Sequence, residues 1–291
     1  MPNTLSQDYK RTCVWKDDLF AGKVVFVTGG AGSICRVQTE AMVLLGADAV
    51  IVGRNGDKAA AAAREVAELR PGAKVLSFAV DVRDINTILE AVKQTVESLG
   101  RIDYVIAGAA GNFLAPITGL SANAFKTVID IDLNGSFNTA KATLPELLKT
   151  KGSVVFVSAT LHYRGLPFQA HPAAAKAGVD SLMKTIAVEF GPLGIRSNAL
   201  APGPIEGTEG MSRLGKGSEH NRQRSYEMIP LGRYGTTQEI ADGTVYLFSP
   251  AAHYVTGQVL VVDGGQWQTT SPRMDAYPSV MLELAKQPNK I

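Results

Sequence analysis

The segment Thr28–Cys35 (TGGAGSIC) contains residue types that suit phosphate binding. It follows a β-branched run, Lys23–Thr28, and opens a stretch with helical periodicity. Glycines let a phosphate approach the backbone closely, and a helix N-terminus offers free N–H groups and a positive dipole. The segment therefore favours the pyrophosphate of a dinucleotide; a tight turn between a strand and a helix is the alternative. The candidate cofactor-binding residues here are Gly29, Gly32, Ser33 and Ile34.

Two later positions bear on which dinucleotide would bind. The second expected strand ends in Gly53–Asn55 (GRN), with no acid before Asp57. A carboxylate at such a place holds the ribose 2′-hydroxyl of NAD, whereas a basic residue suits the 2′-phosphate of NADP. Arg54 therefore favours NADP(H), and a solvated loop cation is the alternative. Asp81 and Val82 follow the third expected strand, where a carboxylate and a backbone amide could read an adenine edge.

The composition is that of a globular protein, because 45% of the 291 residues are hydrophobic and 19% are charged. This composition excludes disorder, collagen and coiled coils. The net charge of +2 is too balanced for a nucleic-acid-binding surface. Two cysteines, Cys13 and Cys35, form no disulfide framework and suit a reducing compartment. Four scattered histidines without a Cys-x-x-Cys pair predict no metal site.

The longest uncharged stretches, 104–125 and 243–262, are long enough to cross a membrane. Polar residues and prolines interrupt both stretches, so we interpret them as buried core with turns. The N-terminal residues lack the basic-then-apolar pattern of a secretion signal. We therefore expect a soluble protein without a membrane span.

Short apolar runs alternate with longer helical patterns from residue 22 onward. This alternation predicts a parallel sheet with helices on both faces, that is, a single-domain, doubly wound α/β fold of the Rossmann type. Residues 1–20 and 268–291 are expected to be extensions of a cofactor-binding catalytic domain at 21–267, with a substrate loop near 204–230. Strands are expected at Lys23–Thr28, Ala49–Val52, Lys74–Val80, Tyr104–Ala107, Ser153–Val157 and Gln258–Val262, and helices at Asp57–Leu69 and Thr237–Phe248.

Between Leu19 and Trp267 the sequence resembles the short-chain dehydrogenase/reductase family in a set of short motifs. Together they are far more specific than the glycine-rich turn alone. The motifs are Thr28-Gly29, Asp81-Val82, Asn134-Gly135, Lys176-Ala177-Gly178, Arg196-Ser197-Asn198, Pro202-Gly203 and Val262-Asp263-Gly264-Gly265. The resemblance implies a nicotinamide cofactor with further contacts at Ala107, Ala109, Lys176, Pro202, Gly203 and Ile205.

The sequence also departs from the family pattern. Ser33 and Cys35 occupy the last two glycine positions of the family's turn. Lys176 of the catalytic Tyr-x-x-x-Lys motif is present, but Pro172 stands in place of the tyrosine and Ala159 in place of the catalytic serine. Carbonyl reduction needs an acidic hydroxyl beside the substrate oxygen. The chain is therefore either a non-catalytic NADP(H)-sensing module or an enzyme for a different hydride transfer.

A different hydride transfer fits one branch of the family, the 2,4-dienoyl-CoA reductases, in particular the peroxisomal ones of fungi. Similar motifs are Ala109–Phe113 (AAGNF), Asp130–Asp132 (DID), Gly135–Asn138 (GSFN) and Ala201–Ile205 (APGPI). The resemblance implies that hydride from NADPH adds at C5 and that protonation of a dienolate at C2 gives a 3-enoyl-CoA. Such a step is auxiliary to the β-oxidation of unsaturated fatty acids. The thioester oxygen then needs hydrogen-bond donors and not a proton, so the tyrosine is dispensable.

The resemblance also implies roles for three residues. Asn134 is expected to be the family's asparagine and to donate to the oxyanion, and Lys176 to hold the nicotinamide ribose. Asp132 is expected to deliver the proton through water. A structural Asn134 and an ordinary helix-face Asp132 are the alternatives, and a conjugate or carbonyl reductase that uses Tyr163 as its acid is an alternative function. The residues expected to bind substrate are Asn112, Phe113 and Arg213.

Partners and location follow from the same resemblance. The segment 211–224 carries four basic residues and one acid, which suits the phosphates of CoA or a solvated loop. The tripeptide Asn289–Ile291 (NKI) resembles divergent peroxisomal addresses, so we expect an import receptor as partner and the peroxisomal matrix as location. The family generally assembles through long helices, here near Ser121–Lys149 and Pro172–Phe190, which implies a homodimer or homotetramer.

Overall fold

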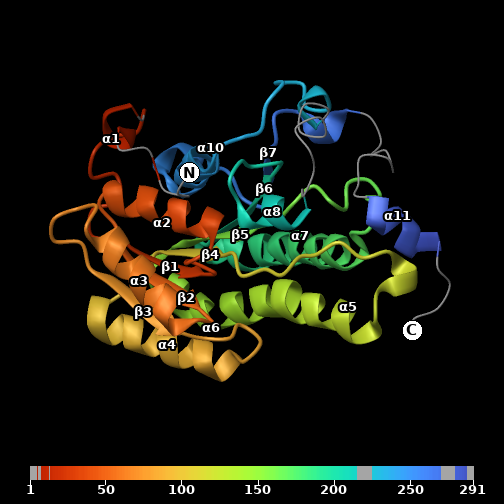
Figure 1. Cartoon of the computed structure of the whole chain (residues 1–291). Coiled ribbons are helices and arrows are strands. Elements are labelled where there is room, and N and C mark those ends of the chain that lie inside the picture. Colours follow the sequence, from red (N-terminus) through yellow and green to blue (C-terminus); the bar gives the residue numbers. More distant parts are fainter. Residues whose placement is uncertain (1–4, 6–7, 13, 215–224, 270–278, 287–291) are drawn as a thin grey trace.

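The computed structural model describes residues 5, 8–12, 14–214, 225–269 and 279–286 and contains a parallel sheet of seven strands (Figure 1). The strand order is β3-β2-β1-β4-β5-β6-β7, so the predicted doubly wound α/β fold is confirmed. The order reverses between β1 and β4, and ligands bind at such a switch point in open α/β sheets. The strands are β1 (Val24–Thr28), β2 (Asp48–Gly53), β3 (Val75–Ala79), β4 (Tyr104–Ala107), β5 (Ser153–Val157), β6 (Arg196–Pro202) and β7 (Val259–Val262).

The sequence-based strands match the structure to within one residue at each end, but β6 was missed. Its sequence, RSNALAP, begins with three polar residues and therefore lacks an apolar run. Two of these polar side chains have hydrogen-bond partners in the fold. The Ser197 hydroxyl donates to the Met183 carbonyl at 2.9 Å, and the Asn198 amide donates to the Val255 carbonyl at 2.9 Å. Tertiary hydrogen bonds thus allow a polar sequence to form a buried central strand.

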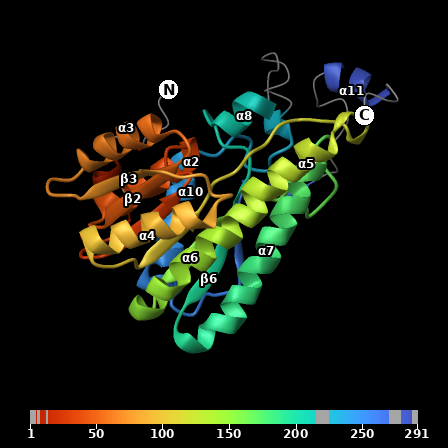
Figure 2. The same ribbon diagram turned by 90° about the horizontal axis from the view of Figure 1, so that it is seen from below.

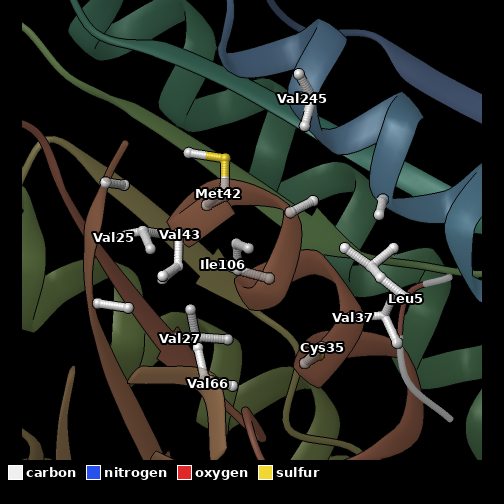
Figure 3. Close-up of a cluster of buried hydrophobic side chains, with 14 of the residues drawn as sticks. Leu5, Val25, Val27, Cys35, Val37, Met42, Val43, Val66, Ile106 and Val245 are labelled. Atoms are coloured by element: carbon white, nitrogen blue, oxygen red, sulfur yellow. The ribbon is translucent and has the colours of Figure 1, made fainter. Parts of the chain in front are cut away.

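Helices cover both faces of the sheet (Figures 1 and 2). Side chains alternate along β1, so that Val25 and Val27 pack on one helical layer and Phe26 on the other. Figure 3 shows part of the first layer, where Val37 and Met42 lie in the same buried cluster as Val25. The first layer contains α2 (Ser33–Leu44), α3 (Gly56–Ala67) and α10 (Thr237–Phe248); the second contains α4 (Ile85–Leu99), α6 (Gly135–Thr150) and α7 (Ala170–Phe190).

A π-helical turn interrupts the long helical stretch that leads into α6. The stretch begins as α5 (Ala122–Ile129), passes through η2 (Asp130–Asn134) and continues as α6. Such turns insert a residue into the helix and change which side chains share a face, and they often mark functional sites. The sequence predicted a helix near Ser121–Lys149, but it carries no local signal for the turn. The turn matters below, because it contains Asp132 and Asn134.

The described part of the N-terminal region packs on the layer of α2 and α10. Tyr9, in α1 (Tyr9–Thr12), is fully buried, and its hydroxyl donates to Asp242 at 2.9 Å. The indole of Trp15 donates to the same carboxylate at 3.0 Å. Residues 1–20, expected as an extension, therefore contribute to the core of the domain where they are described. Among the described residues, no helix combines the length and hydropathy that a membrane crossing requires.

Two further helices lie in or near the regions expected to be irregular. The helix α8 (Glu209–Leu214) lies within the expected substrate loop, and α11 (Ser279–Lys286) lies in the expected C-terminal extension. The remainder of the basic segment, 215–224, and the tripeptide Asn289–Ile291 fall outside the described residues, so both stay sequence-based predictions.

Candidate active site

A cavity of about 700 Å³ opens at the carboxyl ends of the strands around the switch point. Eight of the predicted cofactor-binding residues line it, which are Gly29, Gly32, Ser33, Ile34, Arg54, Asp81, Val82 and Ala109. Its lining does not include the other predicted contacts, which are Ala107, Lys176, Pro202, Gly203 and Ile205. Lys58, Glu209 and Gly210 line the cavity but were not predicted from the sequence.

The glycine-rich turn has the form that a phosphate site requires. Gly29 has φ +69°, and a Cβ atom there would lie 2.8 Å from the Gly108 carbonyl oxygen, so a side chain would not fit. Gly32 is the N-cap of α2, and no side chain caps this helix. The amides at the start of α2 are therefore available to a ligand in the cavity. The Ser33 hydroxyl accepts a 3.2 Å hydrogen bond from the Glu209 amide, which ties α8 to the turn.

Gly108 leaves room for the side chain of Cys35, which stands where the family's turn has a glycine. The Cys35 side chain is buried and its thiol donates to the Gly108 carbonyl at 3.7 Å. A Cβ atom at Gly108 would overlap the sulfur of Cys35. Burial raises the pKa of the Cys35 thiol to about 12, so the group is a neutral packing element. The glycine that α2 lacks at Cys35 is therefore matched by a glycine at position 108, directly after β4.

We expect Gly108→Ala to destabilise the protein by about 1–3 kcal/mol, because the new methyl group overpacks the contact with Cys35. Urea unfolding followed by circular dichroism measures this loss. The double variant Gly108→Ala/Cys35→Gly removes the sulfur and should recover most of the stability. A double variant no more stable than Gly108→Ala would show that this contact is not the cause.

The far end of the cavity is rich in charge. Asn55 caps α3 by accepting from the Lys58 amide at 2.9 Å, and Arg54 and Lys58 are both exposed there. The Lys58 ammonium lies 2.8 Å from a carboxylate oxygen of Glu209, which joins α3 to α8 at the cavity. Asp81 is bound by the guanidinium of Arg83, which holds the pKa of that carboxyl below its usual range. Lys58 and Glu209 are 151 residues apart, so no local pattern could have paired them.

Lys176 and Asp132 form a buried ion pair, with the Lys176 Nζ 3.3 Å from Asp132 Oδ2. The lysine, in α7, is 6% exposed and also donates to the Val157 carbonyl at 2.9 Å. The aspartate is 1% exposed and accepts from the Gly111 amide at 2.7 Å. The Asp132 carboxylate is therefore buried between two partners and does not lie on an exposed helix face.

The structure does not bring Asn134 into this arrangement. Its side chain is exposed and donates to Asp130 Oδ1 at 3.0 Å. The π-helical turn directs Asp132, two residues earlier, towards Lys176 instead. The expected oxyanion role of Asn134 therefore finds no support in this geometry, and the structural alternative describes its observed contact.

The positions of the absent tyrosine and serine hold no replacement hydroxyl acid. Tyr163 follows β5, and burial raises its pKa to about 12, which makes it a weaker acid than an ordinary phenol. Its ring packs edge-on against Trp267, with 5.2 Å between the ring centroids. The hydroxyl of Ser158, next to Ala159, donates to Asp180 at 2.5 Å, and His162 Nε2 lies 2.9 Å from the same carboxylate.

The expected substrate side lies along the loop after β4. The Phe113 ring stacks on that of His171, with 4.2 Å between centroids, and Asn112 Oδ1 is buried without a hydrogen-bond partner. Arg213 belongs to α8, but its side chain is outside the described part of the structure. Among the described residues, no group of histidine, cysteine or acidic side chains could hold a metal ion.

Comparisons with known proteins extend over most of the chain. A family model described as enoyl-(acyl carrier protein) reductase matches residues 29–266. The chain is 56% identical over 284 residues to the peroxisomal 2,4-dienoyl-CoA reductase, (3E)-enoyl-CoA-producing, of Saccharomyces cerevisiae, and 97% of each chain is covered. The protein of the same name from Danio rerio is 46% identical over 263 residues, covering 90% of this chain and 87% of the relative.

Solved structures show the same architecture. A short-chain type dehydrogenase/reductase from Mycobacterium ulcerans matches with a TM-score of 0.83 and 30% identity, covering 91% of this chain and 95% of that one. Carveol dehydrogenase from Mycobacterium avium in complex with NAD matches with a TM-score of 0.77 and 30% identity, covering 86% and 99%. The sheet order, the glycine-rich turn and these matches lead to one conclusion: the chain belongs to the short-chain dehydrogenase/reductase family.

Proposed function

We propose that this chain is an NADPH-dependent 2,4-dienoyl-CoA reductase that produces a 3-enoyl-CoA, auxiliary to the β-oxidation of unsaturated fatty acids. The observation that carries the proposal is the buried pair of Asp132 and Lys176 in a site where Pro172 and Ala159 replace the family's hydroxyl acids. The name of the relative with 56% identity supports the same substrate. The alternative of a carbonyl reductase that uses Tyr163 is disfavoured by the raised pKa of that phenol.

The cavity fits a dinucleotide on the evidence of its own residues. Gly29 has no room for a side chain, so the turn passes close to the loop after β4. The helix α2 has no side-chain cap at Gly32, so its first amides can bind a pyrophosphate in the cavity. Arg54 and Lys58 would bind the 2′-phosphate of NADPH, and Asp81 with Val82 the adenine. Lys176 would hold the nicotinamide ribose. When bound, NADPH supplies the hydride for C5 of the dienoyl group.

The protein's own residues then have two tasks. The first is to stabilise the negative charge that hydride addition at C5 places on C4, C2 and the thioester oxygen, and the ammonium of Lys176 provides a positive field from a buried position. The second is to place a proton donor at C2. Asp132 can accept a hydrogen bond from a water molecule and hold it with one O–H directed at that carbon. Pro172 can replace tyrosine because this proton goes to carbon and not to oxygen.

NADPH oxidation by the purified protein tests the function. We expect rapid oxidation with 2,4-hexadienoyl-CoA, and none with a saturated acyl-CoA or a simple 2-enoyl-CoA. Tight NADPH binding without turnover of this or a longer dienoyl-CoA would favour the sensing module. Turnover of ketones that depends on Tyr163, abolished by Tyr163→Phe, would favour the carbonyl reductase.

The choice of NADPH over NADH gives a prediction of its own. We expect Arg54→Ala to raise KM for NADPH by about 10–100-fold, since a hydrogen bond to a charged group contributes about 1.5–3 kcal/mol. The KM for NADH should change little, because it lacks the 2′-phosphate. Steady-state kinetics with both cofactors measure the ratio, and Arg64→Ala, an exposed arginine on α3, is the control. An unchanged ratio would make Arg54 the solvated loop cation of the alternative interpretation.

Location and assembly are further proposals. We propose the peroxisome as location, supported by the names of the yeast and zebrafish relatives. We also propose a homo-oligomer that assembles through α5, α6 and α7, whose outer faces expose Phe125, Phe137 and Val188. Apolar side chains on neighbouring exposed helices are typical of a subunit interface.

A further inference from the structure

His171 is the histidine in the first turn of α7, next to Pro172, and the reaction proposed above leaves it without a role. Its side chain is fully buried. Neither Nδ1 nor Nε2 has a hydrogen-bond partner of ordinary geometry among the described residues, and the backbone of Phe113 is the polar group that interacts with the ring. Buried polar groups are paired in the great majority of cases, so an imidazole with two unpaired nitrogens calls for an explanation.

The neighbours of His171 place it beside the catalytic pair. Its ring lies against the ring of Phe113, and the amide of Gly111, two residues before, donates to Asp132 at 2.7 Å. Two residues of chain span at most about 7 Å. Asp132 and His171 are therefore held by the same short stretch of loop. Lys176, which pairs with Asp132, lies five residues after His171 on α7, so helix and loop enclose one small region.

The backbone that leads into α7 is strained in a way that fixes this position. Phe168 has φ +64°, an unusual value for a bulky residue, and its carbonyl accepts from the Ala115 amide at 3.1 Å. Strain of this kind concentrates at functional sites. The loop that carries Gly111 and Phe113 is thereby joined to the entry of α7. Gln169, also buried, has an unpaired Oε1 in the same turn.

Burial lowers the pKa of His171 and so favours the neutral imidazole. The hydrogen bond with the Phe113 backbone and the charge of Asp132 act in the opposite direction, and their effects on this pKa are smaller. A neutral imidazole has one N–H donor and one acceptor nitrogen. A donor is what the proton-transfer step lacks, because Asp132 can only accept hydrogen bonds from the water while it is ionised.

We propose that His171 is a positioning residue for the protonation step, and that it donates an N–H hydrogen bond to the oxygen of the water molecule held by Asp132. This inference rests on the proposed function. As the water transfers its proton, an O–H bond breaks and the C2–H bond forms with the electron pair of the dienolate. The electron pair of the O–H bond stays on oxygen as hydroxide, which the His171 donor stabilises. Bulk solvent reprotonates the hydroxide when product leaves.

The test is His171→Phe, which keeps an aromatic ring against Phe113 and removes both nitrogens. We expect kcat with 2,4-hexadienoyl-CoA to fall by about 10²-fold, the loss typical for one donor to a developing negative charge. The affinity for NADPH, measured by fluorescence, should not change. The solvent deuterium isotope effect on kcat should increase, because protonation becomes slower, whereas a packing defect would not change it. His253→Phe, at an exposed histidine, is the control.

Amide variants provide the second arm. His171→Asn places an N–H near Nδ1 and His171→Gln places one near Nε2, so recovery of kcat by one of them would support the proposal and identify the donor nitrogen. Wild-type kcat and isotope effect in His171→Phe would overturn it. If His171→Phe does not fold, the amide variants serve as the test in its place. A reduced kcat in both of them, together with a solvent isotope effect equal to that of the wild type, would also overturn the proposal. Failure of the wild-type protein to reduce dienoyl-CoA would instead reject the proposed function.

Discussion

Asp132→Asn is expected to lower the turnover of 2,4-dienoyl-CoA by about 10²–10⁴-fold, the usual contribution of a group that controls proton transfer. The amide has the shape of the carboxylate and can still accept from Gly111 through one oxygen. Its NH₂ group then faces the Lys176 ammonium, so two donors meet where an ion pair stood. The acceptor that would orient the water is lost. Stopped-flow measurement of NADPH oxidation gives the rate, and equilibrium NADPH binding should stay close to wild type.

The neighbouring acid provides a matched control for this variant. Asp130 lies in the same π-helical turn but binds Lys126 and Asn134, away from Lys176. Asp130→Asn should therefore keep nearly full turnover, and so should Asn134→Ala. The opposite pattern, a large loss in Asn134→Ala with a small one in Asp132→Asn, would restore the assignment made from the family motif.

The contrast between these two residues shows where sequence-based reasoning reaches its limit. The motif placed Asn134 in the catalytic set, but the π-helical turn decides which side chain reaches α7. A helix of regular period and one with an extra residue have nearly the same local sequence pattern, so the difference arises from packing. Gly135 and Gly178 are part of that packing, because a Cβ at either would overlap Val82 or Leu133.

The cofactor half of the site was easier to predict than the catalytic half. The turn at Gly29–Ile34 is a contiguous signal that depends on local backbone conformation, and its four predicted residues line the cavity. The pairing of Lys58 with Glu209 depends on contacts between distant segments. The burial of His171 similarly requires the loop after β4 to fold over α7. Local patterns report local conformation, and they say little about which loops meet above the sheet.

The strands likewise divide into those that a local sequence pattern predicts and one that it does not. Those with apolar runs were predicted to within one residue, since fully buried parallel strands are continuous hydrophobic segments. The polar start of β6 concealed a central strand whose hydrogen bonds come from Met183 and Val255. These residues lie 14 and 57 positions away from their partners in β6, which a local pattern cannot reveal.

Lys176→Met should affect both activity and stability, because the lysine is the charge partner of a buried carboxylate. Removing one member of a buried ion pair typically costs about 3–5 kcal/mol, since the other charge stays desolvated. We therefore expect a lower urea midpoint together with loss of turnover, as the positive field proposed to stabilise the dienolate also disappears. Lys184→Met, at an exposed lysine on the same helix, should change neither quantity.

The double variant Lys176→Met/Asp132→Leu separates these two effects. Replacing a buried ion pair by apolar residues of similar volume is often neutral or stabilising, so the urea midpoint should recover. Turnover should not recover, because neither the charge nor the water-binding carboxylate is restored. Recovered turnover would mean that Lys176 acts through stability alone. A midpoint that stays low would mean that its bond to the Val157 carbonyl, and not the ion pair, stabilises this part of the fold.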